Sequence, residues 1–171
     1  MLPGASNLPN GLGLRPARPS DQPFLAALYS STRADLRLID GEQELVESII
    51  DMQFRAQTMG YGQQFPNAMY FIVEKLNERI GKATIDFGSS AVHVVDIAFI
   101  PIARGRGYGA TVLQAIQQIA GQLKAPMLLS VKKDNLPARR LYQKMGFQLE
   151  QSGAAHDQLV WYPDQKAMQE Y

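Results

Sequence analysis

The spacing of apolar residues changes along the chain between a helical and a strand-like period, and these changes mark the expected elements. Steps of three and four residues predict long helices over 42–59 and 107–123. Shorter helices are expected over about 20–33 and 136–145. The inward face of the helix over 42–59 is predicted to carry Leu45, Ile49, Met52, Ala56 and Met59.

Apolar runs bounded by turn residues predict strands before, between and after these helices. The runs cover 69–75, 80–87, 92–100, 127–131, a stretch from Phe147 onward and 156–162, with a weak strand near Leu14. A turn over 77–79 should join the first two runs, and the last two can pair as a hairpin. Strands and helices in this order predict an α/β fold with a mixed sheet.

A single domain is expected from the length of 171 residues and from the absence of an internal repeat. Proline and glycine gather near the N-terminus, which predicts a flexible arm over 1–13. The domain itself is expected over 14–163, followed by a C-terminal tail over 164–171.

Composition removes several classes of chemistry. The chain has no cysteine, which excludes disulfides, thiolate metal sites and a cysteine nucleophile. Two histidines far apart in sequence do not make a zinc centre, so no metal is expected. A net charge of +1 argues against nucleic acid as a partner. No apolar run approaches the length of a membrane helix and no signal-peptide pattern is visible, so a cytoplasmic protein without a membrane partner is expected.

A glycine-rich loop, R-G-R-G-Y-G over 104–109, follows an expected strand and opens an expected helix. Glycines let a ligand approach the backbone, and a helix N-terminus offers unpaired N–H groups to phosphate. The alternatives are an ordinary turn with solvated arginines, or the dinucleotide fingerprint formed by Gly105, Gly107 and Ala110. That fingerprint is disfavoured because it should follow its strand directly and open a long series of βαβ units.

The charge distribution supports a polyanionic ligand near this loop. Residues 104–144 hold eight basic side chains against one acidic, a local charge of +7 in a chain whose total is +1. Some of these charges, such as Lys124 and Lys144, have an alternative interpretation as solvated helix positions.

Two segments together resemble a known family. Residues 104–109 fit the pattern R/Q-x-x-G-x-G/A, and residues 135–147 fit N-x-x-A-x-x-L-Y-x-x-x-G-F. Both are similar to motifs of the GNAT superfamily of acyl-CoA N-acyltransferases, as is the stretch 96–101 before the loop. The resemblance covers the second half of the chain well and the first half in element order only.

The resemblance implies one GNAT-like domain, with a mixed sheet of six to seven strands splayed between the fourth and fifth and about four helices. It implies an N-acetyltransferase that moves the acetyl group of acetyl-CoA, as co-substrate, directly to the amine of a small molecule or peptide. A non-catalytic acyl-CoA sensor is the alternative, and a homodimer is left open. The implied cofactor-binding residues are Phe99, Ile100, Arg104, Gly105, Arg106, Gly107, Tyr108, Gly109, Asn135 and Arg139.

The resemblance places Tyr142 where the family donates a proton to the departing thiolate. A base is less clear, because residues 89–95 contain no carboxylate where the family often has one. His93 and Asp96 are the candidates, but their parity puts them on opposite faces of a strand unless a bulge intervenes. Core packing for Tyr142, a solvent-facing imidazole for His93 and a helix N-cap for Asn135 are the competing structural roles.

The acceptor is the last expectation. Residues 35–51 hold six acidic side chains against one basic, a local charge of −5. An acidic rim would concentrate a cationic amine, whereas the alternative is that these groups only solvate the outer face of the following helix. The lack of a strong base favours an amine of low pKa over a lysine side chain.

Overall fold

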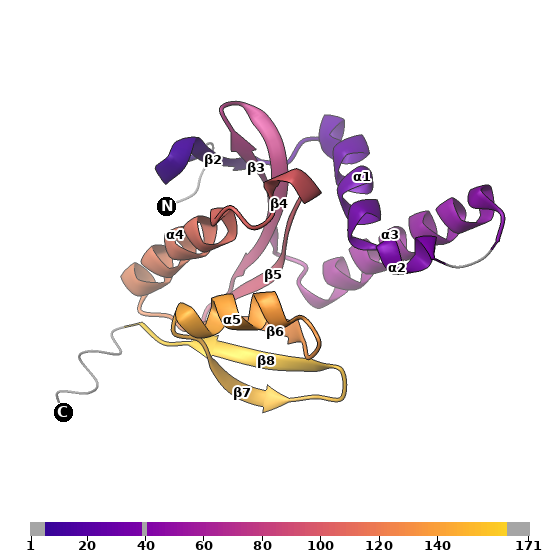
Figure 1. The fold of residues 1–171 in the computed structure, drawn as a ribbon. Helices are drawn as coiled ribbons and strands as arrows, with labels where there is room; N and C mark the ends of the chain where they lie inside the picture. Colours follow the sequence, from indigo (N-terminus) through magenta and orange to yellow (C-terminus); the bar gives the residue numbers. More distant parts are fainter. Residues whose placement is uncertain (1–5, 39–40, 164–171) are drawn as a thin grey trace.

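The computed structural model describes residues 6–38 and 41–163, and in them one sheet forms the centre of the molecule (Figure 1). Residues 1–5 of the expected arm 1–13 and the expected C-terminal tail 164–171 lie outside the described residues. The strand order is β1-β2-β3-β4-β5-β6-β8-β7, and each neighbouring pair is antiparallel except β5 and β6. The strands are β1 (Ser6–Asn7), β2 (Leu12–Pro16), β3 (Met69–Lys75), β4 (Glu78–Phe87), β5 (Val92–Phe99), β6 (Met127–Lys132), β7 (Gln148–Ser152) and β8 (His156–Trp161).

Helices cover both faces of the sheet. They are α1 (Gln22–Thr32), α2 (Ala34–Arg37), α3 (Gln43–Gln64), α4 (Tyr108–Leu123) and α5 (Leu136–Lys144). Along β4, Ala83 and Ile85 join the main core under α4, whereas Lys82 and Thr84 face the other side, where α1 and α3 lie. A mixed α/β sheet with four helices of nine residues or more, plus the four-residue α2, confirms the expected fold within the described part of the chain.

Two local features differ from the expectations. The chain reverses between β3 and β4 at Leu76 and Asn77, not over 77–79, and both residues have positive φ, as a two-residue hairpin turn requires. Residues 6–7 already pair with β2, which begins at Leu12. The described part of the predicted N-terminal arm therefore contributes to the edge of the sheet.

The inward face of α3 is also different. Val46 and Ile50 are the buried residues of this helix and pack with Tyr29 of α1. Leu45, Met52 and Met59, expected inside, are 58%, 67% and 65% exposed. The prediction was wrong because α3 has two apolar stripes, and the helical period fits both.

The sheet opens between β5 and β6. These parallel strands pair only from Val92 to Val94, although β5 continues to Phe99 and β6 to Lys132. Beyond Val94 the two strands separate, which confirms the predicted splay. The gap follows the fifth strand and not the fourth, because Ser6–Asn7 adds a strand at the edge and brings the described sheet to eight strands instead of six to seven. The resulting gap is the feature around which the candidate site is built.

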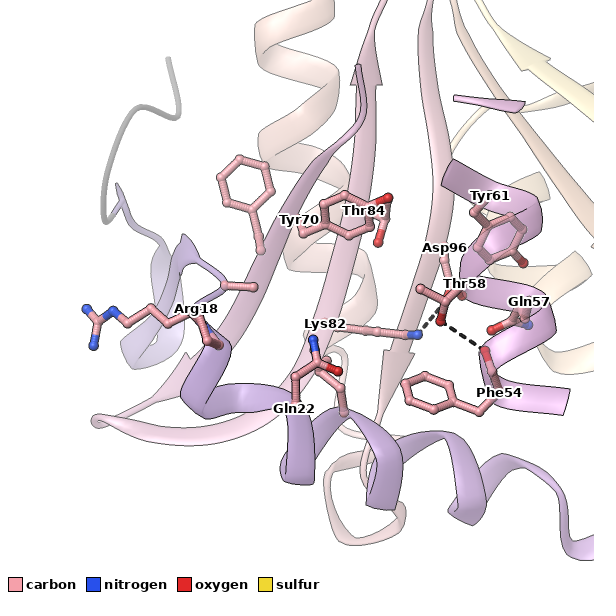
Figure 2. Close-up of a pocket in the computed structure, with 14 residues that line it drawn as sticks. Arg18, Gln22, Phe54, Gln57, Thr58, Tyr61, Tyr70, Lys82, Thr84 and Asp96 are labelled. Carbon is pink, nitrogen blue, oxygen red and sulfur yellow. Dashed lines mark hydrogen bonds and ion pairs between the residues drawn. The ribbon is translucent and has the colours of Figure 1, made fainter. Parts of the chain in front are cut away.

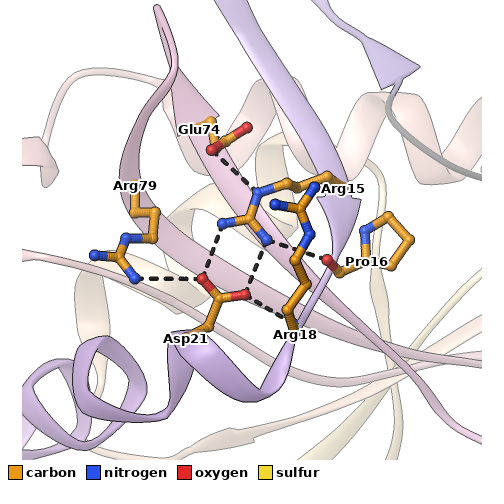
Figure 3. A network of polar contacts seen from close by, with 6 residues as sticks. All are labelled: Arg15, Pro16, Arg18, Asp21, Glu74 and Arg79. Carbon is orange, nitrogen blue, oxygen red and sulfur yellow. Dashed lines mark hydrogen bonds and ion pairs between the residues drawn. The ribbon is translucent and has the colours of Figure 1, made fainter.

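A buried charge network ties the N-terminal strands to α1 (Figure 3). The two terminal guanidinium nitrogens of Arg15, Nη1 and Nη2, donate to the two carboxylate oxygens of Asp21, each at 2.8 Å. Asp21 also accepts the backbone N–H of Arg18 at 2.7 Å, and Arg15 reaches Glu74 of β3 at 3.1 Å. Since Asp21 is 1% exposed and precedes α1, the network fixes where this helix begins over the sheet.

Two features are absent from the described residues. No helix there is long and apolar enough to cross a membrane. No group of three or more His, Asp or Glu side chains in that part of the chain is placed to hold a metal ion.

Candidate active site

A cavity of about 860 Å³ runs along the gap between β5 and β6. It is lined by residues 94–98 of β5 and 128–132 of β6, and by side chains from α1, α3, α5 and β8. The structure brings the three predicted catalytic residues to its wall: Tyr142 from α5, and His93 and Asp96 from β5. Asn135, at the start of α5, lines it as well.

A β-bulge settles the parity of His93 and Asp96. In the pairing of β4 with β5, Ile85 is opposite Val94 but Thr84 is opposite Asp96, so Val95 is an inserted residue. A bulge shifts the alternation of side chains by one position. His93 and Asp96 therefore both line the cavity, while Phe99 packs against the core on the other face.

The two candidate bases have different surroundings. Asp96 Oδ2 is 2.8 Å from Lys82 Nζ, and both side chains are largely buried. The His93 ring packs against Phe65, the residue after α3, with ring centroids 5.3 Å apart and the planes tilted by 46°. Its buried Nδ1 has no hydrogen-bond partner in the described structure and lies 4.0 Å from Asp86 Oδ2. The imidazole is thus held in the cavity wall and not on the outer surface.

Tyr142 is a buried phenol in the wall of the cavity. It is 9% exposed, and its ring packs edge-on against Phe147 at a centroid distance of 5.7 Å. Burial raises the pKa of its phenol, and the negative charge of Asp96 raises it further. A phenol with a raised pKa keeps its proton, so Tyr142 can donate it to a thiolate formed in the cavity.

Tyr61 of α3 is a site residue that the sequence reasoning missed. Its side chain lines the cavity, and burial followed by the charge of Asp96 raises its pKa to about 12. Residues 46, 50, 54, 57 and 61 follow helical spacing, which is the signal that could have found it. The stripe was hidden because it mixes polar with apolar residues.

The glycine loop presents open backbone at the N-terminus of α4. Gly105 and Gly107 have φ values of +72° and +82°, which side chains rarely adopt, and a Cβ at either position would meet no atom within 4 Å. Gly109, inside the first turn, has Leu141 and Phe99 at 3.7 Å from a built Cβ, an ordinary contact. Nothing in the described part of the protein fills the space before these glycines, which fits a bound phosphate.

The loop arginines are held by carbonyl groups. Arg104 Nε donates to the Phe99 carbonyl at 2.9 Å, and its guanidinium also contacts Ser31 of α1 at 3.1 Å. Arg106 Nε donates to the Ile102 carbonyl at 2.8 Å. Both cations thus stay beside the opening of α4.

The free edge of β5 turns its backbone toward the gap. The N–H of Ile100 donates to Ile80 of the neighbouring chain segment at 2.9 Å. Backbone groups of an antiparallel strand alternate in direction, so those of Ile97 and Phe99 point away from β4 and into the gap. An extended ligand with amide groups can pair with this edge.

Other predicted ligand residues have partners of their own. Arg139 Nη1 donates to Asp157 of β8 at 2.6 Å. The Tyr108 side chain is buried under the loop beside Lys75, so only its backbone faces outward at the helix start. Asn135 caps α5 by accepting the N–H of Ala138 at 3.3 Å, which confirms its capping role.

The described part of the acidic stretch 35–51 lies along α2 and α3. Among its described residues, three acids pair with nearby arginines: Asp35 with Arg33, Glu47 with Arg37, and Asp51 with Arg55. None of the residues 35–51 that the structure describes lines the cavity. Three of the five acids that the structure describes here thus pair with arginines on or beside α2 and α3, and the attraction of a cationic amine by this stretch stays a prediction.

A splayed mixed sheet, with a glycine loop opening a helix beside the gap, is the architecture of an acyl-CoA N-acyltransferase. The profile of the acetyltransferase (GNAT) family matches residues 31–147, and the chain belongs to this family. No curated protein matches the sequence significantly.

Solved structures share the fold at low sequence identity. The PaiA N-acetyltransferase from Thermoplasma acidophilum, in complex with coenzyme A, is 15% identical with a TM-score of 0.68, covering 88% of this chain and 98% of its own. An acetyltransferase from Thermus thermophilus is 21% identical, with a TM-score of 0.64 and coverage of 88% and 96%. The ribosomal-protein-S5-alanine acetyltransferase from Vibrio fischeri is 16% identical, with a TM-score of 0.62 and coverage of 95% and 98%.

Proposed function

We propose that this protein is an N-acetyltransferase that moves the acetyl group of acetyl-CoA directly to the amine of a small molecule or peptide. The observation that carries the proposal is one cavity, in the gap of the sheet, whose wall holds Tyr142 together with His93 and Asp96. The family, and the coenzyme A bound to the Thermoplasma acidophilum structure, support acyl-CoA as the donor.

The chain offers a place to each part of the donor. The open backbone of Gly105 and Gly107, together with the N–H of Gly109 in the first turn of α4, would receive the pyrophosphate, with Arg104 and Arg106 beside it. The backbone of Ile97 and the N–H of Phe99 would pair with the pantetheine amides along the free edge of β5, beside the Phe99 carbonyl that accepts from Arg104. Asn135, at the mouth of the cavity, is a further polar group for this arm.

Direct transfer requires two proton movements. An amine, freed of its extra proton by His93 or Asp96 or by a water between them, attacks the thioester carbonyl carbon and a C–N bond forms. As the C–S bond breaks, Tyr142 gives its proton to the thiolate, and the proton lost by the amine nitrogen restores the phenol through the solvent. The products are an amide and the free thiol of CoA.

The experiment measures thiol release from acetyl-CoA over a panel of amines and N-terminal peptides, beside a calorimetric titration with acetyl-CoA. Thiol release that depends on an amine, with the acetylated product found by mass spectrometry, is the expected result. Tight acetyl-CoA binding with no transfer to any amine would favour the non-catalytic sensor instead. Absence of acetyl-CoA binding would overturn both.

A further inference from the structure

A second cavity, of about 440 Å³, lies beneath α1 and α3 on the same face of the sheet (Figure 2). Three of its lining residues, Gln57, Tyr61 and Asp96, also line the cavity in the gap. The two cavities therefore meet at one wall, formed by α3 and the bulged part of β5. An acceptor seated in the second cavity would have its amine at this junction.

The wall of the second cavity is largely aromatic and aliphatic. Leu25 comes from α1, Phe54 and Tyr61 from α3, and Tyr70 from β3. Several polar residues of the wall, such as Thr58 and Thr84, are uncharged. A lining of this kind favours apolar groups, since each buried methylene is stabilised by about 0.8 kcal/mol relative to water.

The charged residues in this wall provide no free counter-ion for a charged substrate group. Lys82 and Asp96 are bound to each other at 2.8 Å, with side chains 13% and 21% exposed, so the pair is neutral as a unit. Arg18 lines the rim with its backbone and stem, and its guanidinium points away from the other residues in Figure 2. A charged substituent would lose its hydration here without gaining a free counter-ion.

We infer that the acceptor is a primary amine whose amine-bearing carbon chain carries an uncharged aliphatic or aromatic group, and that this group occupies the second cavity. The inference rests on the proposed function and names its substrate class. The amine lies at the junction beside Tyr61 and Asp96, where it faces the thioester. Phe54, Tyr70 and the other apolar residues of the cavity set specificity without touching the reacting atoms.

The test compares amines of similar length at saturating acetyl-CoA. 2-Phenylethylamine, with its apolar ring, should exceed 1,4-diaminobutane in kcat/KM by about 10- to 150-fold, the range expected for burying one phenyl-sized group. Because the cavity is neutral, this ratio should change little between low and high salt. Equal rates, or a preference for 1,4-diaminobutane, would overturn the inference.

Two neighbouring positions on α3 provide matched variants. Thr58 lines the second cavity, whereas Met59 does not and is 65% exposed. Thr58→Phe should fill the cavity and lower the kcat/KM ratio of 2-phenylethylamine to methylamine at least tenfold, and Met59→Phe should leave it unchanged. Equal ratios in both variants would place the ring elsewhere. If Thr58→Phe does not fold, Leu25→Ala tests the opposite change, because it enlarges the cavity. It should raise the kcat/KM ratio of 4-phenylbutylamine to 2-phenylethylamine.

The outcomes separate this inference from the proposed function. Thiol release with several amines but no preference for apolar ones leaves the acetyltransferase intact and rejects the substrate class. No release with any amine rejects the proposed function, and a calorimetric titration of 2-phenylethylamine into the protein saturated with CoA then tests the cavity by itself. Binding that is weakened by Thr58→Phe and not by Met59→Phe is the expected result of that titration.

Discussion

The hydroxyl of Tyr142 differs from that of most buried tyrosines, because it faces a cavity large enough for a substrate. The change Tyr142→Phe keeps the ring packed on Phe147 and removes only the proton. We expect kcat to fall by about 10²- to 10⁴-fold, with the Kd of acetyl-CoA unchanged. Steady-state kinetics and calorimetry on the same preparation measure both.

Tyr61→Phe is the matched control for this prediction, since Tyr61 is another tyrosine of raised pKa on the same wall. Its loss of rate should be clearly smaller. A larger fall in Tyr61→Phe than in Tyr142→Phe would identify Tyr61 as the donor, and a fall below threefold in both would make both packing residues.

His93 and Asp96 are tested as bases by their pH profiles. We expect His93→Gln or Asp96→Asn to lower kcat/KM by about 10²-fold or more across pH 6 to 9, because the group that takes the proton of the amine is removed. Lys82→Gln is the control for Asp96→Asn, since it breaks the same ion pair and leaves the carboxylate. Profiles that are indifferent to both substitutions would show that neither residue is the base.

At the scale of the element, the glycine loop and the first turn of α4 give a sharp prediction. Gly109→Val should weaken CoA binding about 10- to 100-fold, because the added methyl groups would crowd Leu141 and Phe99, each 3.7 Å from a Cβ there, and displace the first turn of α4, where one or two charge-assisted hydrogen bonds to phosphate form. Gly109 serves better than Gly107, whose positive φ would add strain to any substitution.

Gly121→Val, near the other end of α4, is the control, because a Cβ there meets nothing within 4 Å. It measures how a glycine-to-valine change in this helix affects stability by itself. Calorimetric titration with CoA compares the two variants. An unchanged affinity in folded Gly109→Val would remove the loop from the proposed donor site.

Elements with one clear apolar pattern could be predicted from the sequence. β5, β6, α4 and α5 lie where the pattern places them, and with them Tyr142 and the glycine loop. The two motifs, over 104–109 and 135–147, predicted these positions because the residues of each motif are close in sequence. The long α3 was found too, but its face was not: Leu45, Met52 and Met59 fit the period as well as Val46 and Ile50 do.

The site depended on contacts that no periodicity contains. The Val95 bulge, which brings His93 and Asp96 to one wall, is one residue inserted into a strand pairing, and only the register with β4 reveals it. The placement of Tyr61 beside Asp96 depends on how α3 lies over the sheet. Both features depend on tertiary packing that joins distant segments, which local sequence does not specify.

For the whole molecule, the Asp21 network gives a prediction about acid stability. The pKa of Asp21 is held well below its ordinary value, mainly by the hydrogen bonds and charge of Arg15. The backbone N–H of Arg18 and the side chain of Arg79 also donate to this carboxylate and lower its pKa further. The stabilisation is therefore present above about pH 4, where the unfolded carboxyl is ionised, and is lost as the pH falls further. Asp21→Asn should lower the free energy of unfolding at pH 7 by about 3 kcal/mol, since it leaves Arg15 without its buried partner.

Urea denaturation between pH 3 and pH 7 measures this effect. The loss of stability in acid should be smaller in Asp21→Asn than in the natural protein. Asp51→Asn, which breaks an exposed pair on α3, should change little at any of these pH values. Parallel acid profiles for the natural protein and Asp21→Asn would assign the acid sensitivity to other carboxyl groups.

The short pairing of β5 with β6 has a consequence for how the molecule unfolds. Only three residue pairs join the strands β1–β5 to the strands β6–β8 through the sheet in the described part of the chain. Two parts connected so narrowly can open as separate cooperative units. A ligand lying in the gap contacts both parts at once and makes their openings interdependent. Amide hydrogen exchange should then slow together in β6 and in the far part of β5 when the gap is filled, although these strands share no pairing beyond Val94.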